Sequence, residues 1–460
     1  MMKCSIQTIC DATGGILVSG NGDAMVVAGV STDTRSLPEG CLFVALVGEN
    51  FDAHDFLAKS VEGGAAAMLV SRVPEDLEAG ERAVIQVDDT LLALQRLARW
   101  YRDKLGLVVV GITGSNGKTT VKDFTRSVLG QRFEVNATKG NLNNHIGVPL
   151  TILSTDENAE VIVVEMGMNH PGEIAPLCEI VRPHLGIITN VGTAHIEHLG
   201  SRDAIAEEKG ALARCLPEVG TLLVTAGCDY ANYYQDRTLA RTVTVGNGRG
   251  MVRAEALVFD KNGASFNLVV EGQGQSQVRV NVVGRHMVNN ALLAAGAGVA
   301  LGLAVDEIAV GLEKAELTSG RLKRFETDGI TVFDDTYNAN PESVKAAIDV
   351  MAEQVTTNGN TKTVVLGMMA ELGRFAEEMH KDVGRHAVGQ GVRLVTVGAE
   401  AAPIAEGGRE LNAQGVNHFD DYSEAAAWLR KELHAGDLVL FKGSRMAAVE
   451  TVMNEAFSKN

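Results

Sequence analysis

Three features are scarce or missing in this 460-residue sequence, and each absence excludes a class of protein. The six cysteines are scattered and form no C-x-x-C pair, so neither a zinc ribbon nor a disulfide framework is indicated. Basic residues are few: 41 lysines and arginines stand against 58 acidic residues, and the net charge of −17 argues against a nucleic-acid partner. The longest apolar run, 291–305, is shorter than the roughly 20 residues that span a bilayer, which argues against a membrane protein.

The start of the chain also lacks the pattern of a secretory signal. Residues 1–13 contain no uninterrupted apolar core of the needed length. The scattered cysteines favour a reducing compartment. We therefore expect a cytoplasmic protein without a nucleic-acid or membrane partner, and we take a monomer as the working assumption.

What is present is the composition of a folded protein with several domains. Hydrophobic residues make up 45% of the chain and charged residues 22%, a balance typical of globular proteins. At about 150 residues per domain, the length predicts about three domains. The apolar run 291–305 contains Gly296, Gly298 and Gly302 and predicts a buried, closely packed helix.

Alternating strand and helix patterns divide the chain into three regions. Residues 1–88 hold two strand-like runs, 41–46 and 65–70, with a helix between them, and predict a small α/β N-terminal domain. Residues 89–317 predict a parallel sheet, because strands alternate with helices; the first helix is expected at 91–104 and strands at 108–112, 161–165 and 186–190. Residues 318–460 predict a Rossmann-like domain with strands at 331–335, 363–367, 394–398 and 438–442.

The later part of the middle region changes character. Strand-like runs 256–260 and 264–270 flank Asn262-Gly263, the strongest short hairpin signal, and a third strand is expected at 277–283. The predicted fold class is therefore α/β with three domains. These are a small α/β N-terminal domain, a central P-loop ATPase-like parallel-sheet domain with an added β-hairpin region, and a Rossmann-like C-terminal domain.

The most informative segment runs from Val108 to Thr120 and reads Val-Val-Val-Gly-Ile-Thr-Gly-Ser-Asn-Gly-Lys-Thr-Thr. An apolar strand enters a glycine-rich turn, and Lys118 and Thr119 open a helical pattern. Backbone N–H groups of such a turn hold phosphate oxygens, the lysine reaches the terminal phosphates, and the threonine hydroxyl ligates Mg²⁺. The usual first glycine is displaced to Gly111, because Ile112 stands six residues before the lysine. The motif predicts a site for a nucleoside triphosphate and Mg²⁺; the alternative is a turn that merely joins strand to helix.

Polar residues follow the next predicted strands, at the ends where open parallel sheets place their ligands. Glu165 ends one strand and is a candidate Mg²⁺ ligand beside Thr119, or else a solvent-facing glutamate. Asn190 ends another and is followed by His195 and His198, which are either metal ligands or two solvated histidines. Considered by itself, Lys209 lies in a segment, Ala206–Gly210, that is typical of a charged, solvated helix face.

Taken together, these segments resemble the central domain of the Mur ligases, the ATP-dependent amide-forming enzymes of peptidoglycan precursor synthesis. The residues that carry this resemblance are Gly111–Thr120, Glu165, Thr189–His195 and Lys209-Gly210. In the first region, Ser31–Arg35 and Gly48–Phe56 resemble the uridine-nucleotide-binding segments of members that act later in the pathway.

Two motifs of the last region narrow the resemblance within the family. Asp334–Pro341 (Asp-Asp-Thr-Tyr-Asn-Ala-Asn-Pro) and Val365–Gly373 resemble the version that adds D-alanyl-D-alanine to a UDP-N-acetylmuramoyl tripeptide. The Asp-Asn-Pro-Arg tetrapeptide, usual in the member that adds the third amino acid, is absent from this sequence. The resemblance covers essentially the whole chain in order, but it does not distinguish meso-diaminopimelate from L-lysine in the tripeptide.

The resemblance also implies roles for individual residues. The catalytic set is Lys118, His195 and Lys209, where Lys209 matches a carbamylated lysine of the family; Thr119 and Glu165 are implied as ligands of one Mg²⁺, and His195 and the Lys209 carbamate of a second. The implied ATP-binding residues are Gly114, Ser115, Asn116, Gly117, Lys118, Thr119, Thr120, Asn290, Arg321 and Asp335. The implied substrate-binding residues are Ser31, Asp33, Thr34, Arg35, Asn143, Asn144, Asn338, Lys442 and Ser444.

The sequence departs from the family pattern at three positions. Met287 replaces the usual asparagine after His286, Met368 replaces the usual aspartate after Gly367, and Ala53 replaces a glycine. We leave Met287 and Met368 out of the predicted site, and we assign His198 no role.

The implied reaction is formation of an acyl phosphate on the tripeptide carboxylate, followed by attack of the D-alanyl-D-alanine amine. Two alternatives stay open. A folylpolyglutamate-synthetase-like ligase would share the central domain but would lack the uridine-type first region. A P-loop ATPase without ligase activity would hydrolyse ATP without a second substrate.

Overall fold

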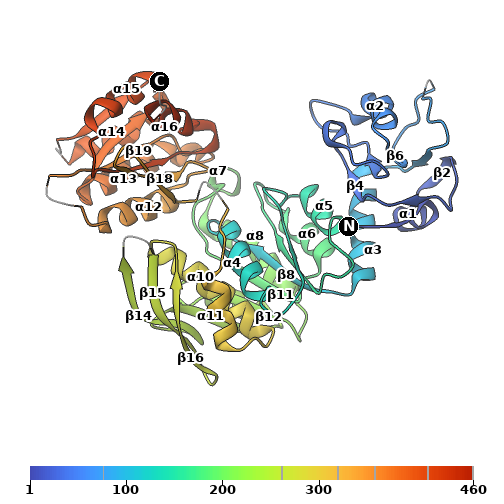
Figure 1. Ribbon diagram of the computed structural model, residues 1–460, viewed down its shortest axis with the longest axis horizontal. Coiled ribbons are helices and arrows are strands. Elements are labelled where there is room, and N and C mark those ends of the chain that lie inside the picture. The colour runs from blue at the N-terminus through green and yellow to red at the C-terminus, as the bar shows by residue number, and fades with distance from the viewer. Residues whose placement is uncertain (76, 261–262, 319–320, 357–358, 412–413, 458–460) are drawn as a thin grey trace.

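The computed structural model describes residues 1–75, 77–260, 263–318, 321–356, 359–411 and 414–457. Figure 1 shows three lobes that follow one another along the chain, from blue at the N-terminus through green and yellow to orange and red at the C-terminus. Each lobe contains its own sheet, and the predicted three-part α/β architecture is confirmed. Within the described ranges, no helix has both the length and the apolar character needed to cross a membrane.

The N-terminal lobe is built on a five-stranded sheet in the order β2-β7-β6-β5-β4. Strands β4 to β7 run parallel, and β2 pairs antiparallel with β7. The two predicted strands and the helix between them are confirmed as β5, β6 and α2. The elements are β1 (Cys4–Ser5), α1 (Ile6–Thr13), β2 (Ile16–Ser19), β3 (Met25–Val26), β4 (Val30–Ser31), η1 (Thr34–Ser36), β5 (Leu42–Val44), η2 (Ala53–Phe56), α2 (Leu57–Glu62), β6 (Ala67–Val70) and β7 (Ala83–Gln86).

Helix α3 (Thr90–Leu105) joins this lobe to the central one, and it confirms the predicted helix. It begins after Asp89, whose side chain accepts a hydrogen bond from the Leu92 N–H, and it ends at Gly106 in the left-handed conformation. Arg96 on this helix donates to the Thr13 carbonyl of the N-terminal lobe at 3.2 Å. The helix therefore belongs to the packing of both lobes.

The central lobe is built on a nine-stranded sheet in the order β16-β15-β14-β13-β12-β11-β8-β10-β9. Strands β8 to β14 pair in parallel, as predicted, and the edge β14-β15-β16 is antiparallel. The strands are β8 (Val108–Thr113), β9 (Val135–Ala137), β10 (Val161–Glu165), β11 (Leu185–Ile188), β12 (Thr221–Thr225), β13 (Arg241–Asn247), β14 (Val252–Asp260), β15 (Gly263–Val270) and β16 (Gly274–Val280). The helices are α4 (Lys118–Leu129), α5 (Gly147–Leu153), α6 (Ile174–Val181), α7 (Ile196–Leu199), α8 (Arg202–Cys215), α9 (Ala231–Gln235), α10 (Arg285–Ala300) and α11 (Val305–Glu313).

The antiparallel edge differs in detail from the predicted hairpin region. β14 begins at Val252, before the predicted start, and its pairing with β15 shifts register between Glu255 and Val258. β16 ends at Val280, so the prediction that the third strand extends to residue 283 is wrong. Asn262, the first residue of the predicted turn, lies outside the described residues.

The predicted close-packed helix is confirmed as α10, although it ends at Ala300 and not at the end of the apolar run. Its glycines allow neighbouring elements to approach. A Cβ on Gly296 would lie 2.6 Å from the Leu223 side chain, and one on Gly298 would lie 2.8 Å from that of Val128. The helix can therefore pack tightly against both the sheet and α4.

The C-terminal lobe is built on a six-stranded sheet in the order β17-β18-β22-β19-β20-β21. All its pairs are parallel except β17-β18, which agrees with the Rossmann-like prediction and adds two edge strands that the sequence patterns missed, β17 and β21. The elements are β17 (Lys323–Thr327), β18 (Ile330–Asp335), α12 (Pro341–Glu353), β19 (Lys362–Leu366), η3 (Gly373–Phe375), α13 (Ala376–Gly389), β20 (Arg393–Val397), η4 (Ala399–Ala401), α14 (Ala402–Glu410), β21 (Val416–Phe419), α15 (Tyr422–Glu432), β22 (Leu438–Lys442), η5 (Arg445–Ala447) and α16 (Glu450–Phe457).

Candidate active site

The glycine-rich segment forms a tight loop between β8 and α4, as the sequence predicts. Gly114 and Gly117 both have positive φ, at 151° and 79°. A Cβ on Gly114 would lie 1.8 Å from Thr189 Oγ1, and one on Gly117 would lie 2.7 Å from Asn290 Oδ1. Only glycine fits these positions, because both the backbone conformation and the neighbouring side chains exclude a Cβ.

Lys118 is the first residue of α4 and directly follows this loop. Its Nζ donates to the Gly114 carbonyl at 2.7 Å, so the side chain folds back over the loop. Burial lowers the pKa of Lys118; Glu165 opposes this shift, and Arg321 adds to it. The loop therefore gathers N–H groups and an amine at one helix N-terminus, an arrangement that binds anions.

Thr119 and Glu165 meet beside the loop, as predicted. Thr119 Oγ1 donates to Glu165 Oε2 at 2.9 Å, and Asn143 Nδ2 donates to the other carboxylate oxygen at 2.9 Å. Glu165 is 3% exposed, so the alternative of a solvent-facing glutamate is wrong. Two hard oxygens at this distance, next to a phosphate loop, match the ligand chemistry of Mg²⁺.

The loop after β11 braces the phosphate loop. Asn190 accepts the Ser115 N–H through its carbonyl at 3.1 Å and the Asn116 N–H through Oδ1 at 3.0 Å. The Gly192 N–H donates to Ser115 Oγ at 2.9 Å. These bonds fix the backbone of Ser115 and Asn116, two of the residues that we predicted to bind ATP.

Residues of the C-terminal lobe reach this site. Arg321 Nη2 donates to Thr119 Oγ1 at 3.3 Å, and its guanidinium lies 4.2 Å from the centre of the Tyr337 ring. Asn340 and Asn116 exchange side-chain hydrogen bonds of 3.1 and 2.7 Å. Two of the predicted ATP-binding residues, Arg321 and Asn116, therefore lie at the junction of the two lobes.

Two further contacts close the junction near His195. Thr193 Oγ1 donates to Glu342 Oε2 at 3.0 Å, and His195 Nδ1 hydrogen-bonds the Glu371 carboxylate. The hydrogen bond from His195 lowers the pKa of Glu371. His198 is exposed and stacks on His170 with ring centres 4.4 Å apart.

The sequence analysis missed Asn340, Glu342 and Glu371. Asn340 and Glu371 lie inside motifs that the resemblance quoted, Asp334–Pro341 and Val365–Gly373, and this position in a family motif was the available signal. Nothing in the local pattern around Glu342 indicates its partner in another lobe.

Lys209 lies inside the protein, on α8. It is 1% exposed, so the interpretation as a solvated helix face is wrong. Its Nζ has one recorded hydrogen-bond partner within the described residues, the Met168 sulfur at 3.7 Å, which is a weak acceptor. Burial, and then the charge of Lys118, lower the pKa of Lys209 well below its ordinary value.

A second polar group lies at the end of the C-terminal sheet. Lys442 Nζ contacts Asp335 Oδ2 at 2.6 Å and donates to the Asn338 carbonyl at 3.0 Å. Ser444 is 1% exposed, and its N–H donates to the Met368 carbonyl. The structure therefore brings together three predicted residues, Asp335, Asn338 and Lys442, whereas the hydrogen bond of Ser444 goes to Met368.

Two remaining ATP-site predictions and one departure lie in helices beside the loop. Asn290 is 6% exposed on α10, and its Nδ2 lies 3.9 Å from the sulfur of Met287. Thr120 is 5% exposed on α4. Met287, the departure from the family pattern, is 4% exposed on α10. It contacts Asn290, and the Asn290 side chain lies beside Gly117 of the phosphate loop.

The predicted UDP-sugar segment lies in the N-terminal lobe and is held by local contacts. Asp33 accepts the Arg35 N–H at 2.9 Å and pairs with its guanidinium at 2.7 Å, and Ser31 Oγ accepts the Asp33 N–H. The hydrogen bonds from Arg35 lower the pKa of Asp33 to about 2. Thr34 opens η1. No hydrogen bond recorded between described residues joins this segment to the phosphate loop.

Asn144 lies on the exposed surface of the central lobe. Its side-chain oxygen accepts the Ile146 and Gly147 N–H groups and so stabilises the start of α5. Asn144 directly follows Asn143, the residue that donates a hydrogen bond to the Glu165 carboxylate.

The described residues contain no group of three or more His, Cys, Asp or Glu side chains that could hold a metal ion unaided. Mg²⁺ commonly takes one or two protein oxygens and completes its shell with phosphate and water oxygens. The Thr119–Glu165 pair fits that pattern, so the donor set is compatible with a Mg²⁺-nucleotide.

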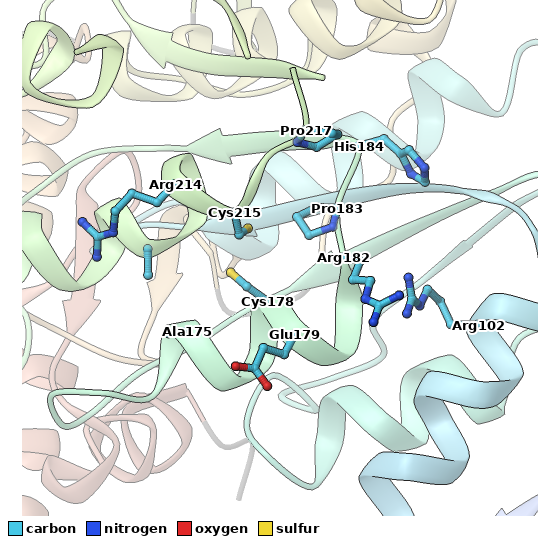
Figure 2. Close-up of a pocket in the computed structure, with 11 residues that line it drawn as sticks. Arg102, Ala175, Cys178, Glu179, Arg182, Pro183, His184, Arg214, Cys215 and Pro217 are labelled. Atoms are coloured by element: carbon cyan, nitrogen blue, oxygen red, sulfur yellow. The ribbon is translucent and has the colours of Figure 1, made fainter. Parts of the chain in front are cut away.

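A separate cavity of about 680 Å³ lies next to α6 and α8 of the central lobe (Figure 2). His184 and Pro217 in its lining come just before β11 and β12, at the amino ends of these strands. Ligands of open parallel sheets bind at the carboxyl ends, where the phosphate loop lies. We therefore do not assign the nucleotide to this cavity.

Comparison with known proteins shows which family the chain resembles. The sequence matches the model of the Mur ligase middle domain over residues 112–298 and that of the Mur ligase glutamate ligase domain over residues 320–445. It is 38% identical to UDP-N-acetylmuramoyl-tripeptide--D-alanyl-D-alanine ligase of Bacillus subtilis (strain 168), over 99% of this chain and 98% of that protein.

Solved structures extend the likeness to the fold. The chain superposes on MurF from Acinetobacter baumannii with a TM-score of 0.92 at 33% identity, covering 100% of both chains. It superposes on the MurF ligase from Thermotoga maritima in complex with ADP with a TM-score of 0.82 at 27% identity, covering 93% of this chain and 96% of that chain. With sequence similarity along nearly its whole length and a phosphate loop closed by the C-terminal lobe, this chain belongs to the Mur ligase family.

Proposed function

We propose that this chain is an ATP-dependent ligase that joins D-alanyl-D-alanine to a UDP-N-acetylmuramoyl tripeptide in peptidoglycan precursor synthesis. The observation that carries the proposal is the contact of Arg321, from the C-terminal lobe, with Thr119 of the phosphate loop. A site completed by a second lobe suits a reaction whose intermediate must be kept from water. The identity of 38% with a ligase of this name over 99% of the chain supports the choice of substrates.

The chemistry explains why basic groups converge at this junction. A carboxylate does not condense with an amine in water, because hydroxide is a poor leaving group. The enzyme therefore transfers the γ-phosphoryl group of ATP to the terminal carboxylate of the tripeptide. The D-alanyl-D-alanine amine then attacks the acyl carbon, and phosphate departs with the electrons of the C–O bond.

Lys118 and Arg321 act on the transferring group. Two anions must approach each other in the first step, and fixed positive charges stabilise the negative charge that spreads over the phosphoryl oxygens. Arg321 donates to Thr119, the neighbour of Lys118, and its charge adds to the lowering of the Lys118 pKa. The proposed phosphate site also includes Gly114, Ser115, Asn116, Gly117 and Thr120. Asn290 lies beside Gly117 of the loop.

Two Mg²⁺ ions belong to the proposed site. Thr119 and Glu165 would hold one ion, and His195 with the Lys209 carbamate would hold the other. Mg²⁺ supplies charge that neutralises the phosphate oxygens. These residues would hold the ions and so would orient the nucleotide against the carboxylate.

The burial of Lys209 supports its carbamylation. A buried ammonium with a thioether as its recorded partner is costly, whereas a low pKa leaves the amine neutral and nucleophilic. The neutral amine attacks CO₂, an N–C bond forms, and a proton is released. The carbamate carries a negative charge and oxygen ligands suited to a hard metal.

The remaining assignments follow the lobes. Residues 1–88 form the UDP-sugar domain, 89–317 the central ATP domain and 318–460 the ligase domain. The proposed substrate contacts are Ser31, Asp33, Thr34 and Arg35 for the uridine nucleotide, Asn143 and Asn144 for the sugar peptide, and Asn338, Lys442 and Ser444 near the ligation site, with Asp335 on ATP. We propose a cytoplasmic monomer.

One assay tests the proposal. Phosphate release from ATP is measured with each UDP-muramoyl tripeptide, ending in meso-diaminopimelate or L-lysine, with and without D-alanyl-D-alanine. We expect sustained turnover only when ATP, Mg²⁺, tripeptide and dipeptide are all present. Rapid turnover with ATP alone would favour a P-loop ATPase, and turnover with folate and glutamate would favour the folylpolyglutamate-synthetase-like alternative.

A further inference from the structure

The contact between α7 and η3 joins the central and C-terminal lobes at His195. The Glu197 N–H donates to the Glu371 carbonyl at 3.1 Å. Gly373 packs so closely that a Cβ there would lie 2.9 Å from the Glu197 side chain. These two contacts therefore hold the backbone around Glu371 against the central lobe.

The two residues that meet in this contact share an unusual backbone. His195 has φ of 63° and Glu371 has φ of 61°, although neither is glycine. Side chains disfavour this conformation, and it persists where the surroundings fix it, which is common at functional sites. The two residues with this backbone conformation contact each other, because His195 Nδ1 hydrogen-bonds the Glu371 carboxylate.

We propose that Glu371 is a positioning residue that orients His195 for metal binding and so makes the second metal site depend on closure of the C-terminal lobe. This inference rests on the proposed function, because it takes His195 as the metal ligand. A histidine that binds a metal through one nitrogen commonly donates the N–H of the other to a carboxylate, which fixes the tautomer and the ring orientation. With Nδ1 directed to Glu371, Nε2 is the nitrogen left to ligate.

The location of the His195–Glu371 pair couples metal binding to closure of the C-terminal lobe. His195 comes from the loop after β11, next to the residues that brace the phosphate loop, whereas Glu371 precedes η3 in the other lobe. Separation of the lobes removes the carboxylate from the histidine. The metal site is then complete only in the closed arrangement, in which Arg321 also reaches Thr119.

Another contact of the same junction provides a comparison. Glu342 accepts a hydrogen bond from Thr193, two residues before His195, and so is a carboxylate that links the lobes without touching the histidine. A matched histidine–carboxylate pair exists within the C-terminal lobe, where His386 Nε2 contacts Asp349 Oδ1 at 2.7 Å. Glu342→Gln and Asp349→Asn therefore serve as controls for a lost inter-lobe contact and a lost histidine partner.

The experiment compares Glu371→Ala, Glu371→Asp and the two controls with the parent. Mn²⁺ replaces Mg²⁺, and its binding in the presence of a non-hydrolysable ATP analogue and tripeptide is followed by electron paramagnetic resonance. We expect Glu371→Ala to weaken one of two Mn²⁺ sites by about 10- to 100-fold, the usual effect of losing such a partner. Glu371→Asp should recover part of this loss, and Asp349→Asn should bind both ions as the parent does.

Small-angle scattering under the same ligands measures closure. Glu371→Ala should show a larger radius of gyration than the parent, and in turnover its kcat should fall with little change in the KM for the tripeptide. A thermal melt of each variant shows whether it is folded. Parent-like Mn²⁺ binding in Glu371→Ala would overturn the inference, and so would a lost closure with both metal sites intact, because Glu371 would then be a latch only.

The outcome is separable from that of the proposed function. A parent that makes no D-alanyl-D-alanine adduct refutes the proposed function. The Mn²⁺ and scattering measurements do not require turnover, so they still decide whether Glu371 orients His195. Glu342→Gln tests closure alone: if it widens the radius, it should weaken the same Mn²⁺ site, and a widened radius with both Mn²⁺ sites intact would contradict the dependence of that site on closure.

Discussion

The two predicted ligand regions of this protein are held in opposite ways. At the phosphate loop the polar side chains are buried and bonded to residues far away in sequence: Glu165 is 3% exposed, Lys209 is 1% exposed, and Arg321 comes from another lobe. In the N-terminal lobe, the Arg35 side chain is 88% exposed and its recorded ion pair is with Asp33, two residues away. One region is interlocked, and the other is held locally.

This difference teaches which part of the site is formed in advance. Buried polar groups are costly unless they are bonded, so the contacts around the phosphate loop favour a single geometry. Charges fixed before reaction stabilise a transition state without reorganisation. The exposed pair in the N-terminal lobe can rearrange when a ligand arrives, and we expect it to contribute to binding more than to chemistry.

The largest expected effect tests the interlocked region. Lys118→Ala should lower kcat by a factor equivalent to about 3 kcal/mol or more, because it removes a positive charge fixed at the transferring phosphoryl group. Calorimetric titration with the UDP-muramoyl tripeptide should give parent-like affinity. Arg126→Ala, an exposed change on the same helix, is the control. Equal loss of nucleotide-sugar binding in Lys118→Ala would contradict the separation of the two regions.

Lys209 gives the next largest effect. Lys209→Ala should lose most activity while the protein stays folded, because the variant cannot form the carbamate that we propose as a metal ligand. Acetate or formate should restore part of the activity by placing a carboxylate in the vacated space. The measurement is turnover with and without these anions, in buffers with and without bicarbonate.

Arg214→Ala, on the exposed side of the same helix, is the control for Lys209. Its turnover should match the parent and should not respond to acetate. Full activity of Lys209→Ala in bicarbonate-free buffer would show that the carbamate has no role.

The sequence predicted the interlocked region well where the information is local. The phosphate loop was readable because a strand, a glycine turn, Lys118 and Thr119 are contiguous, and the sheet topology then places Glu165 beside Thr119. The strands β5, β6, β8, β10, β11, β18, β19, β20 and β22 were found for the same reason, since buried strands are short apolar runs. The parallel strands β4, β7, β9, β12 and β13 were missed. The edge strands β17 and β21 were missed, because one face of each is more polar and the pattern weaker.

Contacts between residues far apart in the sequence were not readable from local patterns. Lys209 lies in a charged stretch, Ala-Glu-Glu-Lys-Gly, that is typical of a solvated helix, yet packing against Met168 buries it. The partner of His195 is Glu371, 176 residues later, and no spacing in the sequence indicates this pairing. Tertiary packing decided both cases, and the resemblance to a family reached Lys209 but not the role of Glu371.

A smaller effect is expected in the locally held region. Arg35→Ala should raise the KM for the UDP-muramoyl tripeptide roughly tenfold, the size of one lost hydrogen bond to a charged group, with kcat nearly unchanged. Steady-state kinetics with varied tripeptide measures both constants. Lys3→Ala, an exposed basic residue of the same lobe outside the segment, should match the parent. A fall in kcat with unchanged KM would place Arg35 in the chemistry and remove the contrast between the regions.

The smallest expected effect compares how a buried histidine of the C-terminal lobe and the exposed Asp33–Arg35 pair respond to acid. His380, beside the Val365–Gly373 motif, accepts the Met369 N–H at 2.9 Å and bonds the Ala376 carbonyl at 2.7 Å, and burial lowers its pKa. Between about pH 7 and pH 5 the unfolded histidine takes up a proton that the folded one resists, so its contribution to stability falls as the pH falls. Asp33, whose pKa is lowered to about 2, keeps its contribution over that range and loses it as the pH falls from about 4, where the unfolded carboxyl takes up its proton, through about 2.

Denaturant unfolding of the parent, His380→Gln and Asp33→Asn at the two pH values separates these cases. The difference in unfolding free energy between parent and His380→Gln should be smaller at pH 5 than at pH 7. At pH 5 the unfolded parent binds a proton that the folded parent resists, whereas the variant has no imidazole to protonate in either state. The difference between parent and Asp33→Asn should be the same at both values. A gap for His380→Gln that does not change with pH would mean that its imidazole is as easily protonated in the fold as in the unfolded chain, and acid would then fail to distinguish the buried region from the exposed one.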